Sequence, residues 1–150
     1  MMLKFRAWDK YEKTMLDVHG INFDEYGVWT RELIDDEDDG GFILTEDVKL
    51  LQYTGLKDKN NTKIYDGDIV EFEDGVLAIA GDDESIVGTI NRAVISIDIV
   101  NGIQLKDFMF EGAVSENDYF EYIDIKSFLR YDCEVKGNIF ESSHLLEVTE

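Results

Sequence analysis

The chain has 150 residues, enough for one domain with a sizeable core or for two very small ones. Apolar residues make up 44% of it, near the globular average, which excludes a disordered chain. The net charge of −20 is spread over both halves and is not an acidic tail, so we expect a solvated acidic surface that does not bind nucleic acid directly.

The first third of the chain predicts short strands and one acidic loop. Apolar segments at 3–9 and 14–21 flank a short polar stretch and predict an opening hairpin. Residues 21–30 repeat the pattern, with a turn at 24–27. Residues 31–41 contain five consecutive acids and two glycines, which cannot pack as a strand, so an exposed loop is predicted.

The middle of the chain alternates strands with turn signals. Residues 42–55 have β-type composition, and Asn60 and Asn61 favour a turn because asparagine tolerates left-handed backbone angles. Gly67 predicts a tight turn into a strand that starts at Asp68. The Asp-Gly pair ending at Gly75 predicts the next turn. The chain has no proline, so turns must come from glycine, asparagine and aspartate.

The last third begins with the clearest strand pattern, at 86–100, where Ile95, Ile97 and Ile99 share one face. The Asn-Gly pair at 101–102 predicts a hairpin, with 103–110 as its return strand. The pattern at 113–130 is compatible with either a strand or a short helix. Ser115 with Asp118 resembles a helix-capping box.

Residues 133–140 predict a strand whose inward side chains are Cys133, Val135 and Ile139. Residues 141–148 predict a short helix or turn. About eight short strands in all favour a mainly β fold, either a sandwich or a partly open barrel with one or two short helices. No linker or repeat divides the chain. We therefore expect a single domain over 1–150, with a finer division into a β subregion at 1–47 and a barrel at 48–150.

Three segments together resemble a known family: KFRAWDK at 4–10, QYTGLKDKNNTKIYDGDIVEF at 52–72 and EVKGNIFESSHLL at 134–146. The chain resembles the YopX-like family of phage and prophage proteins. It departs from the family pattern at Asn60-Asn61, where Asn-Gly is common, and at Glu141-Ser142-Ser143, where Glu-Asn-Pro is common. Both departures keep the chemistry of a turn.

The resemblance implies a mostly β fold with an SH3-like barrel that begins at the Gly67-Asp68 strand. It also implies a phage-encoded protein located in the cytoplasm of the host cell. It carries over no activity and no catalytic residues. The N-terminus lacks the long apolar run of a signal peptide, and no stretch approaches 18 apolar residues, so neither export nor a membrane span is expected.

The acidic loop matches the register of a calcium-binding loop. Acids fill positions 1, 3, 5 and 12 of that register, and Gly40 fills position 6; the four acids are Asp35, Glu37, Asp39 and Glu46. Clustered carboxylates suit Ca²⁺, which takes six to eight oxygen ligands. The alternative is a solvated acidic loop, which the lack of long flanking helices favours.

Two constellations in the 52–72 segment have a chemical and a structural interpretation. Asp66 and Asp68 near Tyr65 suggest acid–base chemistry, but the turn at Gly67 explains them better. Three lysines, with Tyr53 and Tyr65 nearby, faintly resemble a nucleic-acid contact; they are Lys57, Lys59 and Lys63. Asp58 and the overall charge argue against that contact, so solvated lysines beside a turn are expected.

The remaining reactive residues are isolated in the sequence. Cys133 is the only cysteine, which excludes an intrachain disulfide, and we expect it to be a buried strand residue. His19 and His144 lie near opposite ends with no ligand spacing. No phosphate-binding, nucleophile-elbow or metalloprotease motif occurs. We therefore predict no catalytic, cofactor-binding or metal-binding residues and a protein that is not an enzyme.

Composition and resemblance leave three functional hypotheses. The first is a phage accessory protein that acts by protein–protein contact or by self-association as a homo-oligomer. The second is an acidic DNA mimic that inhibits a nucleic-acid-binding protein of the host. The third is a metal-dependent or Ca²⁺-stabilised module built on the acidic loop. The sequence names no partner and no small-molecule ligand.

Overall fold

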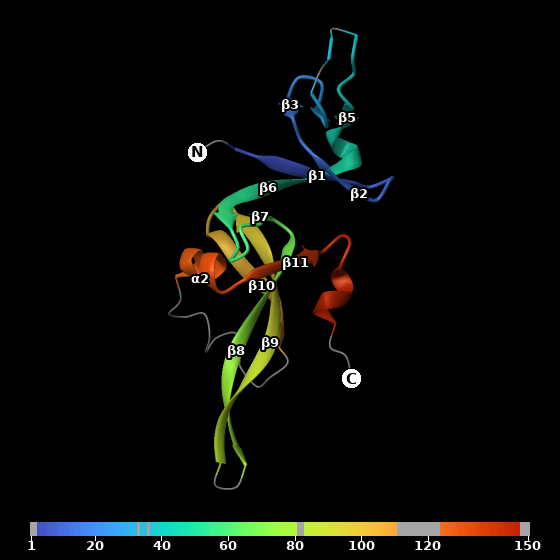
Figure 1. Cartoon of the computed structure of the whole chain (residues 1–150). Coiled ribbons are helices and arrows are strands. Elements are labelled where there is room, and N and C mark those ends of the chain that lie inside the picture. The colour runs from blue at the N-terminus through green and yellow to red at the C-terminus, as the bar shows by residue number, and fades with distance from the viewer. Residues whose placement is uncertain (1–2, 33, 36, 81–82, 111–123, 148–150) are drawn as a thin grey trace. The chain divides into compact units, whose positions relative to one another are not determined.

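A computed structural model describes residues 3–32, 34–35, 37–80, 83–110 and 124–147, with the backbone alone for 74–80, 83–89 and 110. The fold is mainly β, as predicted (Figure 1). The chain divides into two compact units, residues 1–53 and 54–150. The boundary falls inside strand β6, a few residues after the predicted division at 47, and each unit is described below by itself.

The first unit contains two small antiparallel sheets. In one of them β2 and the first part of β6 flank β1, and the other has the order β3-β4-β5. The elements are β1 (Phe5–Asp9), β2 (Thr14–Asp17), β3 (Gly20–Asn22), β4 (Gly27–Trp29), β5 (Ile43–Leu44), the 3-10 helix η1 (Thr45–Asp47) and β6 (Val48–Lys57). The hairpins predicted at 3–21 and 21–30 are confirmed. Ala7, Val28 and Val48 form the buried centre of this unit.

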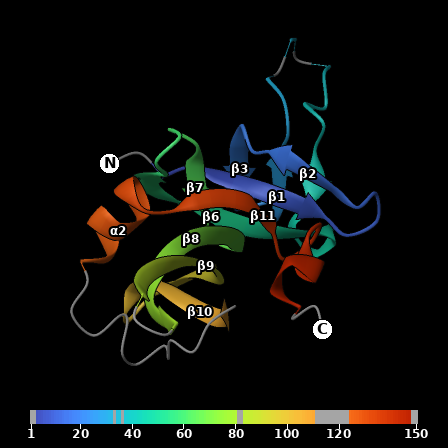
Figure 2. The ribbon, with the colours of Figure 1, turned by 60° about the horizontal axis from the view of Figure 1, so that its bottom comes forward.

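The second unit is built on one four-stranded antiparallel sheet of order β10-β9-β8-β11. Its elements are β7 (Lys63–Tyr65), β8 (Asp68–Ala80), β9 (Asp83–Asp98), β10 (Gly102–Phe110), the helix α2 (Ile125–Tyr131), β11 (Glu134–Asn138) and the 3-10 helix η2 (Ser143–Leu146). The sheet curls into a half-barrel, and Figure 2 shows the curvature of β8, β9 and β10. A partly open barrel is therefore confirmed, whereas its SH3-like character stays a prediction.

Helix α2 closes the concave side of this sheet. The ring of Phe128 on α2 meets the ring of Phe72 on β8 edge-on, with centroids 5.0 Å apart. Asp124 caps the helix because its carboxylate accepts a hydrogen bond from the N–H of Lys126. The pattern at 113–130 is compatible with either a helix or a strand, and it suggests Ser115 and Asp118 as a helix cap. These two residues lie outside the part of the chain that the structure describes.

The turn predicted at Gly75 is wrong. Strand β8 runs through Glu73, Asp74 and Gly75 without a break, and Gly75 pairs with Gly88 of β9. An Asp-Gly pair bends the chain only where no neighbouring strand holds it extended. Here β9 supplies a cross-strand partner for each residue from Ile69 to Ala80, so tertiary pairing overrides the local signal.

The inward position predicted for Ile139 is also wrong. The register of β11 against β8 shifts between Val135 and Gly137, which marks a β-bulge. A bulge adds one residue to the strand and reverses the alternation of side chains beyond it. Cys133 and Val135 accordingly pack on the core, whereas Ile139 is 38% exposed.

Asparagine and aspartate build the turns of this proline-free chain, as expected. The side-chain oxygens of four such residues each accept hydrogen bonds from two backbone N–H groups two and three positions later; they are Asp9, Asn22, Asp98 and Asn138. These bonds lower the pKa of Asp98, because N–H groups stabilise the carboxylate. Asp9 and Asp98 are therefore structural acids.

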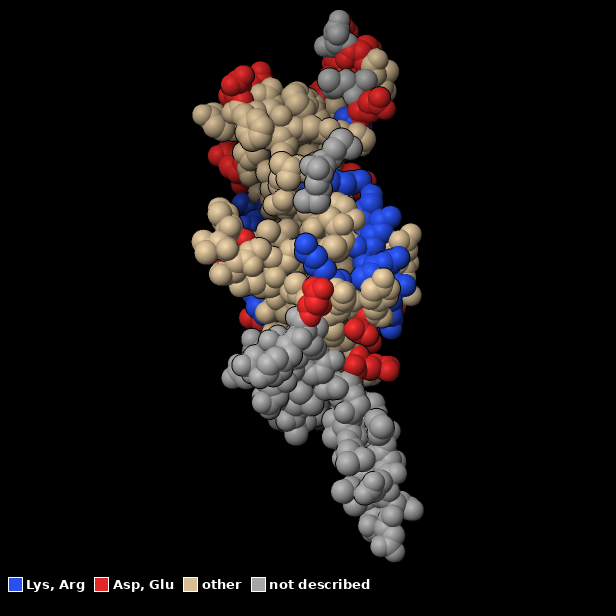
Figure 3. Space-filling view, turned by 90° about the vertical axis from the view of Figure 1, so that its left-hand side faces the viewer, with Lys and Arg blue, Asp and Glu red and all other residues tan. Residues whose placement is uncertain are grey.

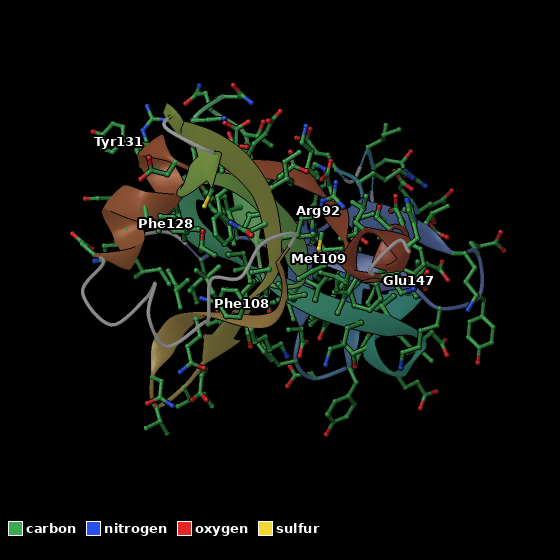
Figure 4. The ribbon with its side chains drawn as sticks, turned by 90° about the horizontal axis from the view of Figure 1, so that it is seen from below. Arg92, Phe108, Met109, Phe128, Tyr131 and Glu147 are labelled. Carbon is green, nitrogen blue, oxygen red and sulfur yellow. The ribbon has the colours of Figure 1, made fainter. Side chains whose placement is uncertain are left out.

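A charged network holds the C-terminal segment on the convex side of the second unit's sheet. Arg92 of β9 donates one hydrogen bond to Glu71 of β8 and another to the carbonyl oxygen of Leu145 in η2. Lys136 of β11 lies near Glu71 as well. Figure 4 shows Arg92 on the side where η2 lies and Phe128 on the helix that covers the opposite side. A single arginine thus joins two strands and η2.

One buried polar group in this unit has no partner. Asn91 lies on β9 opposite Phe72, on the same face as Ala93 and Ile95, and is fully buried. Neither its amide oxygen nor its amide nitrogen makes a hydrogen bond. An unpaired buried amide costs about 1–3 kcal/mol of stability, so this position lowers the stability of the second unit.

We expect Asn91→Leu, which keeps the branched shape without the polar atoms, to raise the free energy of unfolding by about 1–2 kcal/mol. The melting temperature should rise by several degrees, which calorimetry or circular dichroism measures. Asn138→Leu is the matched control, because Asn138 is also buried but its oxygen accepts two N–H groups, so this change should destabilise the protein. A loss of stability in Asn91→Leu similar to that in the control would contradict the assignment.

Candidate functional site

Asp58 organises the segment at 52–72. It lies in the turn between β6 and β7, is fully buried, and its carboxylate accepts hydrogen bonds from the N–H groups of Asn60 and Thr62 in the same turn. The other carboxylate oxygen accepts the N–H of Val135 in β11, at 2.8 Å. Asn61 has the left-handed backbone angle that the sequence predicted. Asp58 therefore both closes the turn and fastens it to the last strand.

The turn at Gly67 is confirmed. Gly67 has a φ of 85°, and the carboxylate of Asp68 accepts the N–H of Tyr65, at 2.8 Å. Asp68 and Tyr65 are both buried. The backbone of Gly67 also bonds to Ile95 and Ile139. These residues hold the entry to β8 in place, which fits the structural interpretation of the pair Asp66 and Asp68.

The turn that carries Lys59 is joined to an arginine that the sequence did not associate with it. Arg130, in the last turn of α2, donates a hydrogen bond to the carbonyl oxygen of Asp58, and the N–H of Lys59 donates to the carbonyl of Cys133. The turn and the end of α2 are thereby joined.

Asp58 was expected to oppose the three lysines of the 52–72 segment, but its carboxylate turns into the protein and is bound by three N–H groups. Lys59, Lys63 and Arg130 are exposed, whereas Asp58 is not. Figure 3 shows Lys and Arg side chains beside Asp and Glu side chains on the face that it draws. The Asp58 carboxylate is therefore occupied within the turn and does not lie at the surface beside the exposed lysines.

The acidic loop holds Arg31 through two neighbouring aspartates. Its guanidinium donates to Asp38 at 2.7 Å and to Asp39 at 3.0 Å. The hydrogen bond from Arg31, with two backbone N–H groups, holds the pKa of Asp38 well below its usual value, and the same bond raises the pKa of Arg31. Asp38, outside the predicted calcium positions, makes the stronger contact.

The predicted calcium ligands do not come together among the described residues of the chain. Asp39 is paired with Arg31, Asp35 accepts the N–H of Glu37, and Glu46 lies in η1. No group of three potential metal ligands is found in the part of the chain that the structure describes. The calcium hypothesis thus gains no geometric support, and its test remains titration with the metal.

A cavity of about 550 Å³ lies in the first unit. Residues from the β3–β4 hairpin and the start of the acidic loop line it; they are His19, Gly20, Trp29, Arg31 and Glu32. No short-range pattern in the sequence predicts this cavity, because it depends on which residues face one another across the hairpin. His144, the second histidine, is exposed in η2 of the other unit.

The distal parts of β8 and β9 form a two-stranded ribbon (Figure 1). Strand β11 pairs with β8 only up to Glu71, and β10 pairs with β9 only from Asn91 onward. Beyond these points, residues 73–80 and 83–90 pair with each other and with no other described strand. The ribbon therefore has two outer edges whose backbone groups are not bonded to another described strand.

Cys133 is fully buried in the core of the second unit, as predicted. Burial raises the pKa of its thiol well above the usual range, and the nearby charge of Asp132 adds to the effect. A thiol in this environment is a poor nucleophile, because the reactive species is the thiolate.

Comparison with known proteins identifies the family of this chain. The chain matches the family described as YopX protein over residues 4–147. The chain belongs to the YopX family. The family match includes all three segments that carried the resemblance in the sequence, and the ribbon lies within it.

A crystal structure of protein EF1440 from Enterococcus faecalis is similar to this chain, with a TM-score of 0.60 and 26% sequence identity. The similarity covers 98% of this chain and 99% of that one. No curated protein matches. Among the described residues, no helix has the length and apolar character needed to cross a membrane. YopX membership thus comes with a shared architecture but without a named activity.

We expect Asp58→Asn to lower the free energy of unfolding by about 1–3 kcal/mol, because an amide nitrogen cannot accept the N–H that a carboxylate oxygen accepts. Urea denaturation measures the change. Asp132→Asn removes the same charge from an exposed neighbour and should leave stability nearly unchanged. Equal stability of Asp58→Asn and the wild-type chain would show that the turn does not depend on this carboxylate.

We expect Cys133 to react with a thiol reagent such as DTNB only when the second unit opens. At pH 8 labelling should be at least ~100-fold slower in the folded chain than in urea. Ser143→Cys on a Cys133→Ser background places a thiol at an exposed site and should react at once. Rapid labelling of native Cys133 would contradict its burial.

Proposed function

We propose that this chain is a phage- or prophage-encoded accessory protein that acts in the host cytoplasm by binding a second copy of itself or another protein, and not by catalysis. The observation that carries the proposal is the two-stranded ribbon of β8 and β9. The buried thiol of Cys133, with its raised pKa, supports a role without nucleophilic chemistry.

The ribbon has the properties of a β-strand docking element. An isolated two-stranded hairpin is only marginally stable in water, and unpaired strand edges accept another strand through main-chain hydrogen bonds. Proteins usually protect such edges with lysine, proline or charge. The ribbon carries acids only at its base, Glu73 and Asp74, and near its tip, Asp83 and Glu84. Between them, the sequences GVLAIA at 75–80 and SIVGTI at 85–90 contain no charge and no proline and are mostly apolar. A ribbon of this composition gains most by pairing with another chain.

The acidic DNA mimic remains the alternative, but no particular contact favours it. A mimic needs carboxylates spaced like phosphates over one face. In the described residues Asp58 and Asp68 are buried, Asp38 is paired with Arg31, and Glu71 is paired with Arg92.

The pairing of β8 with β9 shows which residues can be deleted to remove the ribbon without changing the rest of the sheet. Gly75 pairs with Gly88, so replacing 76–87 by Asn-Gly joins them through a two-residue turn and keeps the four-stranded part of the sheet. We expect this variant to remain folded by circular dichroism. It should lose self-association in light scattering or, if the partner is another protein, capture of that protein from lysogenic host lysate.

The matched control removes apolar groups from a different hairpin. Ile99→Ser with Val100→Ser alters the fully exposed tip between β9 and β10 and should leave association unchanged. A full-length chain that is strictly monomeric and captures no partner at low or high salt would refute the proposed function. Association that survives deletion of the ribbon would refute the ribbon as its basis.

A further inference from the structure

The cavity beside Trp29 has a preformed aromatic wall. Gly20 is the cross-strand neighbour of Trp29, and a Cβ atom there would lie 3.0 Å from the indole ring. Phe42 packs against the indole with centroids 5.7 Å apart, and its ring occupies the place that a side chain at Gly27 would take. Two glycines of one hairpin thus make room for the aromatic pair, in which Phe42 supports Trp29 and Trp29 lines the cavity.

Carboxylates outnumber cations around the cavity. Arg31 is the only arginine or lysine among the residues that line it, and its guanidinium already donates to Asp38 and Asp39. Glu32 contributes another carboxylate, which makes no ion pair or hydrogen bond with the described residues. At neutral pH one guanidinium stands against three carboxylates, so the local field is negative.

This combination selects a cationic ligand. An anion would meet a net negative field and would compete with two aspartates for Arg31. A cation would gain an ion pair with Glu32 and would lie beside the indole of Trp29, which lines the cavity. The volume of about 550 Å³ lies within the usual range for ligand sites and admits a long side chain with its flanking backbone.

We propose that the cavity lined by Trp29, Glu32 and Arg31 binds a lysine or arginine side chain that a basic partner protein presents. The net charge of −20 favours such a partner at long range, because it attracts basic proteins and repels acidic ones. The inference goes beyond the proposed function, since it concerns the first unit and does not require the ribbon.

The test uses the full chain labelled with ¹⁵N and two probes of the same shape, N-acetyl-arginine amide and its neutral citrulline counterpart. We expect the arginine probe to shift the Trp29 indole N–H signal and the amides of residues 19–20 and 31–32, with a dissociation constant of roughly 1 mM or weaker. The citrulline probe should produce much smaller shifts. A longer arginine-containing peptide should bind more tightly, and the affinity should fall with salt.

Two variants locate the site. Glu32→Gln should weaken arginine binding about threefold, and Trp29→Leu should remove it. Glu12→Gln is the matched control, because it removes the same charge from an exposed loop of the first unit outside the cavity and should bind like the wild-type chain.

Equal binding of arginine and citrulline would overturn the proposal, as would equal effects of Glu32→Gln and Glu12→Gln. Shifts confined to residues away from the cavity would also overturn it. The ribbon-deleted chain should retain arginine binding. The proposal for the cavity and the proposal for the ribbon can therefore be refuted independently of each other.

Discussion

The second unit depends on one buried carboxylate more than on any other polar group. Asp58 accepts two N–H groups of its own turn and one from β11, which lies 77 residues later in the chain. Arg130 and Lys59 add two bonds between the same turn and the α2–β11 connection. Charge-assisted bonds of this kind are stronger than neutral ones when buried, so the hairpin, the helix and the last strand hold one another in place.

The same device explains why a chain with 34 acids can form a compact β fold. Aspartates at turns direct their charge toward backbone N–H groups, where it replaces the rigidity that proline would otherwise supply. The acids at Asp38 and Glu71 are paired with Arg31 and Arg92. The count of 34 acids therefore overstates the number of carboxylates that are available to contact a partner, although the net charge of −20 is unchanged by these pairings.

Local features of the sequence predicted local structure well. Three features need only short-range backbone geometry, and all three were predicted. They are the turns at Asn61 and Gly67 and the hairpin between β9 and β10, whose second strand begins at Gly102. The turn at Gly75 and the inward position of Ile139 failed because pairing with distant strands decided them. Arg130, Asn91 and the cavity beside Trp29 carry no short-range signal, since each depends on residues brought together by the sheets.

The difference between local and long-range determinants of structure also explains why the recognisable 52–72 segment does not reveal an activity. Its Tyr, Asp and Lys residues first suggest an active site, yet Asp58 and Asp68 are occupied by backbone N–H groups and build the fold. The ribbon and the cavity are formed by other segments and offer complementary kinds of recognition. A strand edge binds through main-chain groups and discriminates little between sequences, whereas a charged aromatic cavity selects a side chain. In the function that we propose, the strand edge would supply affinity and the cavity would supply specificity.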